Sequence, residues 1–214
     1  MRIKALVALF MGLLAAGSLA AQAPVVGPPP PLDPENTFVL DLSNGGRVLL
    51  QLRPDAAPGH VERIKTLTRK GFYNGLTFHR VIDGFMAQGG DPKGDGTGGS
   101  DLPDLKAEFT ALPHVRGALA AARGESPDSA NSQFFIMLAP RLSLDGRYTV
   151  FGRVVGGMNH VDAIAKGEPP ADPTRILQAS IAADNLAPPA MATVPAPATV
   201  PGPAIRVDSA PTPQ

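Results

Sequence analysis

The sequence predicts a mainly β domain, either an antiparallel sandwich or a closed barrel, with two helices. Eight short apolar runs, most of them bounded by turn-forming residues, predict strands. Glycine-rich connections join these runs and only two segments have helical periodicity, so the crossover helices that a parallel sheet needs are missing. A sheet that closes on itself would also leave no exposed strand edge. The pattern by itself does not distinguish a sandwich from a barrel.

The composition excludes several classes of protein. The 214-residue chain carries 19 Lys and Arg against 19 Asp and Glu, so it offers no broad cationic surface for a nucleic-acid backbone. It has no cysteine, which excludes a disulfide scaffold, a thiol nucleophile and a thiolate metal site. The length favours a single domain, and many of the 24 prolines lie outside it, in the two tails.

The N-terminus has the order of a secretory signal peptide. Arg2 and Lys4 precede an apolar run over residues 5–14, and small residues follow that run. We expect a signal peptide over residues 1–20, or over 1–23 if a second cleavage site is used. The alternative is an uncleaved membrane anchor, although the apolar run is too short to span a bilayer. Cleavage would place the protein in the periplasm, or outside a cell without an outer membrane, with no stable membrane insertion.

Two proline-rich segments flank the expected domain. Residues 21–36 include four successive prolines, which fix φ and remove amide donors, so we expect an extended linker there. Residues 185–214 are rich in proline and alanine with little aromatic content, and we expect a disordered tail. Flexible spacing is the expected role of both, with docking to a proline-binding module as the alternative. The folded domain is therefore expected over residues 37–184.

The domain is expected to open with a β-hairpin. Residues 37–42 and 47–52 are apolar-rich, and Asn44-Gly45 between them supplies the positive φ angles that a hairpin turn needs. A helix over residues 60–71 is expected next, because apolar side chains recur at helical spacing, basic residues fill the last turn and a glycine ends it. The remaining strands are expected at residues 77–81, 85–88, 117–122, 133–138, 148–154 and 176–182, with a second helix at 158–165.

Metal and nucleophile chemistry have little support in the sequence. The four histidines lie 19, 35 and 46 residues apart, so no two have the close spacing of a helical metal-ligand pair. The glycine-rich stretch 89–99 lacks the Gly-Lys-Ser/Thr of a phosphate loop and has Lys93 where a calcium loop has a ligand, so we expect a mobile loop. No Gly-x-Ser-x-Gly motif occurs, although a triad assembled from distant residues stays open.

One stretch combines residues that suit a binding site. Residues 78–91 read FHRVIDGFMAQGGD, and residues 131–136 read NSQFFI. In a strand-turn-strand arrangement Arg80 would face the Phe85-Met86 pair, and a glutamine and a phenylalanine from neighbouring strands would join them. The alternative is that the apolar side chains belong to the core and that Arg80 forms a surface ion pair.

These motifs resemble those of the cyclophilin family of peptidyl-prolyl cis-trans isomerases. FHRVIDGFMAQGGD is similar to the family signature at almost every position, and GTGG at 96–99, SQFFI at 132–136 and LDGRYTVFGRVVGGM at 144–158 continue the resemblance in the same order. The resemblance covers residues 37–184. It implies an eight-stranded antiparallel closed β-barrel capped by two α-helices, in agreement with the hairpin and the helices expected above.

The resemblance also implies which residues form the site. Arg80 and Gln88 take the catalytic positions: the guanidinium donates to the prolyl nitrogen, and Gln88 holds the peptide carbonyl and orients Arg80. The residues implied to bind the substrate are His79, Phe85, Met86, Ala122, Arg123, Gln133, Phe135, Leu144 and Tyr148.

The chain departs from the eukaryotic members of the family at three positions. Arg123 stands in place of the asparagine in their Ala-Asn-Ala segment, so the side chain that meets the peptide beyond the proline differs, while backbone hydrogen bonds from Ala122 or Arg123 could survive the change. Ser143 replaces a tryptophan of drug-sensitive members, and Tyr148 replaces a histidine on the pocket rim. The resemblance therefore implies weakened cyclosporin binding and a retained isomerase activity.

The implied function is that of a rotamase that accelerates X-Pro rotation while exported proteins fold. The mechanism is non-covalent and needs neither a cofactor nor a metal. The implied partners are proline-containing peptides and unfolded or folding exported proteins, and a monomer is expected because no heptad pattern occurs. The alternative is a non-catalytic module that binds proline segments or acts as a chaperone, and a hydrolase is a distant third.

Overall fold

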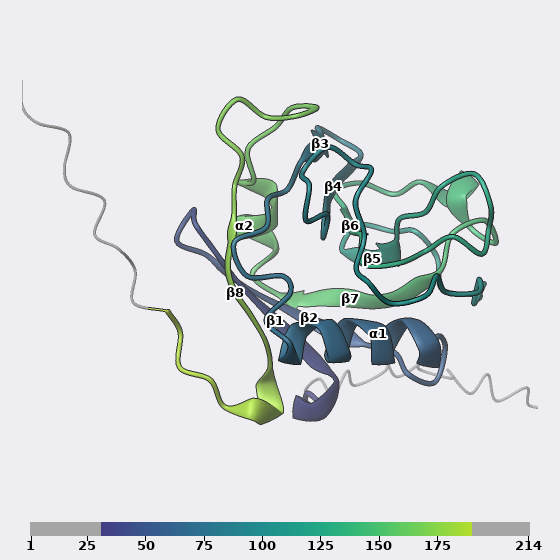
Figure 1. The fold of residues 1–214 in the computed structure, drawn as a ribbon, viewed down its shortest axis with the longest axis horizontal. Coiled ribbons are helices and arrows are strands. Elements are labelled where there is room, and N and C mark those ends of the chain that lie inside the picture. Colours follow the sequence, from purple (N-terminus) through teal and green to yellow (C-terminus); the bar gives the residue numbers. More distant parts are fainter. Residues whose placement is uncertain (1–30, 190–214) are drawn as a thin grey trace, which may run out of the picture. The chain divides into compact units, whose positions relative to one another are not determined.

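The computed structural model describes residues 31–189, in which eight strands form one antiparallel sheet that curls into a barrel (Figure 1). The strands are β1 (Thr37–Leu42), β2 (Arg47–Leu52), β3 (Arg80–Ile82), β4 (Met86–Gly89), β5 (Ala118–Ala121), β6 (Phe134–Met137), β7 (Val150–Gly156) and β8 (Ile176–Ile181). Their order in the sheet is β3-β4-β6-β5-β7-β2-β1-β8. The expected eight-stranded antiparallel architecture is confirmed. Of the two alternatives, a sandwich and a barrel, the sheet forms the barrel.

The barrel closes through loop contacts instead of a continuous ladder. The edge strands of the sheet, β3 and β8, do not pair with each other; the isolated bridges Thr77–Arg175 and Val81–Gly167 instead join the segment around β3 to the segment before β8. In the second bridge the Val81 N–H donates to the Gly167 carbonyl at 2.8 Å, and the Gly167 N–H donates back at 2.9 Å. The expected eight-stranded antiparallel architecture therefore holds, whereas a closed barrel overstates it, because β3 and β8 do not pair across this irregular seam.

Helix α1 (Pro58–Arg69) begins two residues earlier than the sequence predicts. Pro58 occupies the first turn, where its missing N–H costs no hydrogen bond. No local side chain caps the helix; instead the Glu108 carboxylate accepts the amides of Gly59 at 2.9 Å and His60 at 3.0 Å. A cap from a residue almost fifty positions away cannot be recognised in the sequence around the helix.

Helix α2 (Met158–Asp162) is shorter than predicted, because it tightens after Asp162 into a turn in which the Ile164 N–H donates to the Val161 carbonyl. Gly157 precedes it with a φ of 78°, and a Cβ there would lie 2.1 Å from the Arg47 carbonyl oxygen. Only glycine fits both the left-handed backbone and this close approach. Helix α1 packs against β8 and β7, and α2 packs against β2, so that the two helices cover the barrel (Figure 1).

The folded domain begins before Thr37. The predicted linker was expected to stay extended through Asn36, but Pro34–Asn36 form a 3-10 turn, capped by the Asp33 carboxylate. Glu35 in this turn pairs with Lys65 and Arg69 of α1. Hydrogen bonds from Arg69 and Lys65 lower the pKa of Glu35 to about 2, so the pairing persists wherever the carboxyl is ionised.

Several sequence-based expectations lie outside the described residues. These are the signal peptide over 1–20, the linker up to residue 30, and the tail from residue 190 onward. Within residues 31–189 no helix is long and apolar enough to cross a membrane.

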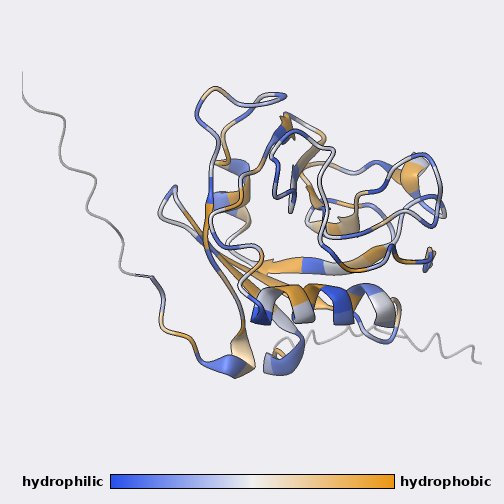
Figure 2. Ribbon diagram, in the orientation of Figure 1, coloured by the Kyte–Doolittle hydropathy of each residue, from blue (hydrophilic) through white to orange (hydrophobic). Residues whose placement is uncertain are grey.

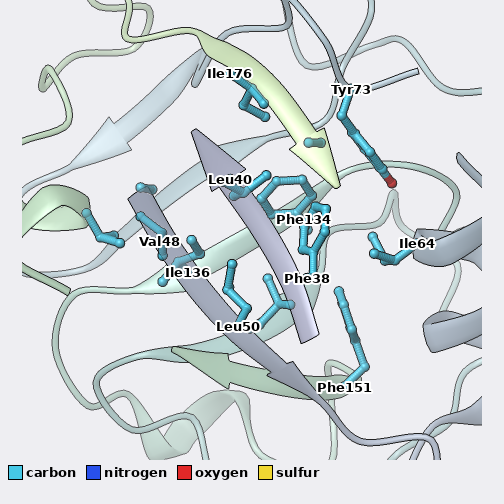
Figure 3. Close-up of a cluster of buried hydrophobic side chains, with 14 of the residues drawn as sticks. Phe38, Leu40, Val48, Leu50, Ile64, Tyr73, Phe134, Ile136, Phe151 and Ile176 are labelled. Carbon is cyan, nitrogen blue, oxygen red and sulfur yellow. The ribbon is translucent and has the colours of Figure 1, made fainter. Parts of the chain in front are cut away.

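The core fills the barrel and follows the two-residue period of the strands. Phe38, Leu40 and Leu42 of β1 point inward, where the alternate residues of β2 meet them. Apolar residues dominate these strands and the inner stripe of α1 (Figure 2). Phe134 of β6 is fully buried and meets the rings of Phe38 and Tyr73 edge to face, as Figure 3 shows.

A second apolar cluster lies on the outer face of the sheet. It consists of buried residues from β4, β5, β6 and β7 together with half-buried side chains from the adjoining loops. Successive side chains of β6 point to opposite faces of the sheet, so two neighbouring phenylalanines are separated: Phe134 points into the barrel and Phe135 points to this outer cluster. A half-buried apolar surface outside the core is a place where a ligand can bind.

Candidate functional site

The register of four strands places the predicted catalytic residues in one row. Arg80 of β3 is paired with Gln88 of β4, Gln88 with Phe135 of β6, and Phe135 with Ala120 of β5. Residues directly opposite each other in an antiparallel sheet share a face. The row therefore runs across the outer face, from a cationic end through an amide to an aromatic ring.

A cavity of about 150 Å³ opens beside this row. We call this cavity the proline pocket, after the role that the family resemblance implies for the residues around it. Nine of the predicted site residues line it: Arg80, Phe85, Met86, Gln88, Ala122, Arg123, Phe135, Leu144 and Tyr148. The two others, His79 and Gln133, do not. The pocket has the size and the mixed apolar and polar lining of a site for one small apolar group held next to a cation.

The apolar wall of the pocket is an ordered aromatic cluster. The Tyr148 ring meets the Phe135 ring edge to face at a centroid distance of 5.9 Å, and the imidazole of His114 stacks on Phe135 at 6.0 Å. His114 is fully buried, and its Nδ1 lies 2.7 Å from an Asp145 carboxylate oxygen. His114 thus fixes both Phe135 and the turn that carries Leu144. Sequence analysis missed it, since a lone histidine in a loop carries no recognisable pattern.

Arg80 is held by a residue that the sequence did not indicate. Its Nε donates to a carboxylate oxygen of Glu168 at 2.7 Å, and both side chains are about half exposed. Within the described part of the chain the terminal nitrogens of Arg80 donate to no protein group. The alternative interpretation, a surface ion pair, is correct about the pair, but Arg80 lines the proline pocket as well.

Gln88 is oriented by Gln133. The Gln88 Nε2 donates to Gln133 Oε1 at 2.9 Å, and the Gln133 amide donates in turn to the carbonyls of Gly96 and Gly98. No hydrogen bond joins Gln88 to Arg80 among residues 31–189, so the expectation that Gln88 orients the arginine is wrong and Glu168 does so instead. Gln133 lines a larger neighbouring hollow of about 450 Å³ and acts on the proline pocket through Gln88.

The glycine-rich loop beyond β4 is built around a buried carboxylate. Asp91 is only 1% exposed and accepts the amides of Lys93, Asp95 and Gly96 at 2.8, 3.1 and 2.6 Å. Burial opposes its ionisation, but these donors outweigh burial and hold its pKa below the ordinary value. The amides of the loop thus converge on one anion, and the loop in turn supplies the carbonyls that hold Gln133.

His79 lies beneath this loop, outside the proline pocket. It is 5% exposed, and neither ring nitrogen has a partner among the described residues. Burial lowers its pKa, although the charges of Asp91 and Asp95 oppose that shift. His79 is therefore a neutral, packed neighbour of Arg80, and the structure does not place it where it could touch a bound proline.

We expect Asp91→Asn to lower the free energy of unfolding by about 2 kcal/mol, because it replaces charge-assisted hydrogen bonds by weaker ones. Urea unfolding above pH 5 measures the difference. The folded pKa of Asp91 is depressed, so its contribution is complete above the ordinary carboxyl pKa and is lost as the pH falls through the folded value. The difference in the free energy of unfolding between wild type and variant should therefore decrease on acidification. A difference independent of pH would contradict this assignment.

Arg123 crosses the rim of the pocket. Its guanidinium carbon lies 4.6 Å from the centre of the Tyr148 ring, and its nitrogens donate to the backbone carbonyls of Arg147, Gly124 and Glu125. The Ala122 N–H donates to the Gln133 carbonyl at 3.0 Å. Of the two backbone positions expected to bind a peptide, the Ala122 amide is thus already used within the sheet.

Known proteins are similar to this chain in sequence and in architecture. Residues 37–181 match the family model described as cyclophilin type peptidyl-prolyl cis-trans isomerase. A probable peptidyl-prolyl cis-trans isomerase of Brucella suis is 52% identical over 168 residues, which cover 71% of this chain and 85% of that protein. Peptidyl-prolyl cis-trans isomerase B of Bacillus subtilis is 43% identical over 129 residues, which cover 59% of this chain and 89% of its own.

Solved structures agree with these matches. A cyclophilin from Hirschia baltica superposes with a TM-score of 0.66 at 28% identity and covers 73% of this chain and 77% of its own. A cyclophilin type peptidyl-prolyl cis-trans isomerase from Cryptosporidium parvum, crystallised in the presence of the dipeptide Ala-Pro, superposes with a TM-score of 0.63 at 28% identity. That match covers 68% of this chain and 98% of the other.

Proposed function

The chain belongs to the cyclophilin-type peptidyl-prolyl cis-trans isomerase family, and on that premise we propose that it isomerises X-Pro bonds of exported proteins at the proline pocket. The reaction itself follows from the family and from relatives of that name. What we add is the assignment of the site and of the substrates. One observation supports the site above all others, namely the row of Arg80, Gln88 and Phe135 along a pocket of about 150 Å³.

The chemistry required is rotation about an amide, with no bond made or broken. Resonance gives the X-Pro bond a barrier of roughly 18–20 kcal/mol, so a catalyst must bind the twisted amide better than either planar isomer. Phe85, Met86, Phe135 and Leu144 hold the pyrrolidine ring while the acyl side turns. The related protein crystallised with Ala-Pro supports a proline peptide as the ligand of this fold.

Arg80 supplies the interaction that exists only in the twisted state. As resonance is lost, the prolyl nitrogen regains a lone pair that can accept a hydrogen bond. The guanidinium is always protonated and presents a rigid fork of donors. Because Glu168 holds Nε, the terminal nitrogens are left to donate to the substrate, and Gln88, held by Gln133, donates to or accepts from the peptide backbone beside them.

Glu168 is a positioning residue in this mechanism. We expect Glu168→Ala to lower kcat/KM up to about fivefold, since a half-exposed ion pair contributes at most about 1 kcal/mol. Glu168→Gln retains an acceptor for Nε and should restore most of the activity. Exchange NMR on a proline peptide measures both variants. If the two variants behaved alike, the pair would not orient Arg80.

Export is supported by the signal-like sequence at the N-terminus, where a basic start, an apolar run and small residues follow one another. A rotamase in the periplasm would meet unfolded chains after their translocation, when slow X-Pro isomerisation limits folding. The intact mass of the protein from a periplasmic fraction tests this. A chain that begins at Ala21 or Pro24 agrees with export, whereas a full-length cytoplasmic protein contradicts it.

The test of the site is exchange NMR between the cis and trans forms of an Ala-Pro peptide, which needs no coupled protease. We expect catalytic concentrations of the protein to raise the rate of cis–trans exchange, which broadens the two sets of proline resonances and produces exchange peaks between them. Proline-ring resonances should show contacts to Phe135 and Leu144. Exchange without contacts to these residues would place the reaction elsewhere on the surface, and binding without exchange would make the domain a binding module.

A further inference from the structure

We propose that this isomerase prefers proline segments with an acidic residue next to the proline, because two guanidinium groups at the rim of the proline pocket have no carboxylate partner. The inference rests on the proposed site and specifies its substrate class. The two groups belong to Arg123 and Arg141. Each lies over an aromatic ring that itself lines the pocket.

The first cation is Arg123, on the ring of Tyr148. Its donors reach only neutral backbone carbonyls, and within residues 31–189 it forms no ion pair. It borders the proline pocket and the hollows on either side of Gln88, so a peptide in any of these places passes it. A guanidinium fixed by a ring and by carbonyls loses little freedom when it binds an anion.

The second cation is Arg141, which lies over the ring of Phe85 with 5.1 Å between its guanidinium carbon and the ring centre. Its side chain is exposed, and it too lacks an ion-pair partner in the described part of the chain. Phe85 and Tyr148 come from different loops, so the two arginines mark separate points of the rim.

The carboxylates near the pocket are already engaged. Glu168 pairs with Arg80, Asp145 bonds to the buried His114, and Asp83 lies 3.9 Å from Lys166. In the neighbouring hollows, Asp104 accepts from the Asn131 side chain and Asp95 accepts from Thr97. Asp104 and Asp95 keep their negative charge but line only these neighbouring hollows, whereas the proline pocket itself is lined by Arg80 and Arg123 and by no carboxylate of the described residues.

A peptide carboxylate suits such a rim for a physical reason. The Arg141 guanidinium makes no hydrogen bond among the described residues, so its parallel donors can match the two oxygens of a carboxylate in charge-assisted bonds. Arg123, whose donors already reach carbonyls, attracts the carboxylate mainly by its charge. A lysine in the same peptide position would be repelled. Because the rim is exposed, the effect should act mainly on association and should weaken as salt screens the charges.

The test compares three peptides that differ only in the residue before the proline, Glu, Gln or Lys, and three that differ in the same way after it. We expect kcat/KM for the Glu peptide to exceed that for the Gln peptide about three- to fivefold in at least one series at low salt, with the Lys peptide lowest. In about 1 M salt, where the Debye length is about 3 Å, the ratio should approach one.

The variants Arg123→Gln and Arg141→Gln identify the source of the preference. Each should reduce the Glu-to-Gln ratio, and the double variant should abolish it; Arg153→Gln, an exposed arginine of β7 outside the proline pocket, is the matched control and should leave it unchanged. Equal rates for the Glu and Gln peptides in both series, with normal turnover, would overturn the proposal while leaving the site intact. No turnover of any peptide would instead overturn the proposed site.

Discussion

Replacing Arg80 by alanine is expected to lower kcat/KM by about 10²–10³-fold, the loss that follows removal of one preorganised donor from a transition state. The loss arises because the guanidinium donates to a nitrogen that accepts only while the amide is twisted. Arg80→Lys should lower kcat/KM nearly as much. The ammonium keeps the charge, but it lacks the planar fork whose Nε donates to Glu168 while the terminal nitrogens face the substrate. Exchange NMR at equal enzyme concentrations measures both variants.

The stability of the Arg80 variants provides the control. The side chain is 42% exposed and its ion pair with Glu168 is at the surface, so the free energy of unfolding should change by less than about 1 kcal/mol. A melting temperature near that of the wild type together with a large loss of exchange would assign Arg80 to catalysis. Unchanged exchange in Arg80→Ala would contradict the whole mechanism, and the alternative interpretation of a mere surface ion pair would then stand.

The parts of the fold that were predictable are those encoded locally. The hairpin of β1 and β2 is visible because both strands are apolar-rich and Asn44-Gly45 supplies its turn. The strand predicted at 77–81 instead begins at Arg80, because Thr77 and Phe78 bond to the segment before β8, about a hundred residues away. Contacts at such separations leave no periodicity in the sequence.

The same division applies to the site. Residue spacing suggested Arg80 with Phe85 and Met86, whereas Leu144, Tyr148 and Gln133 followed only from the family resemblance. The pairing of β4 with β6, which puts Gln88 beside Phe135, joins residues 47 positions apart. Three further residues lie in loops whose local sequence does not indicate what they contact, namely Glu168, His114 and Arg141. Each was recognisable only once the structure placed it next to a site residue.

The neighbouring phenylalanines of β6 offer the sharpest separation of stability from function. Phe134→Ala should lower the free energy of unfolding by about 3–5 kcal/mol, because it empties a site in the closed core next to Phe38 and Tyr73. Phe135→Ala should cost less stability, since its ring borders an open pocket that water can fill. It should instead lower kcat/KM by about tenfold or more, because the pyrrolidine ring loses its main apolar contact, worth roughly 1.5–3 kcal/mol.

Urea unfolding and exchange NMR on the same two variants decide the matter, with each variant serving as the control for the other. Both variants replace phenylalanine by alanine at adjacent positions of β6. They therefore differ only in the face of the sheet from which the ring is removed. If Phe135→Ala unfolded as readily as Phe134→Ala while its folded fraction kept full turnover, Phe135 would be a core residue. The outer cluster would then be packing, and the proline pocket would have to lie elsewhere. A catalytic loss confined to Phe135→Ala would place substrate on the outer face, because no structural defect common to both variants could produce it.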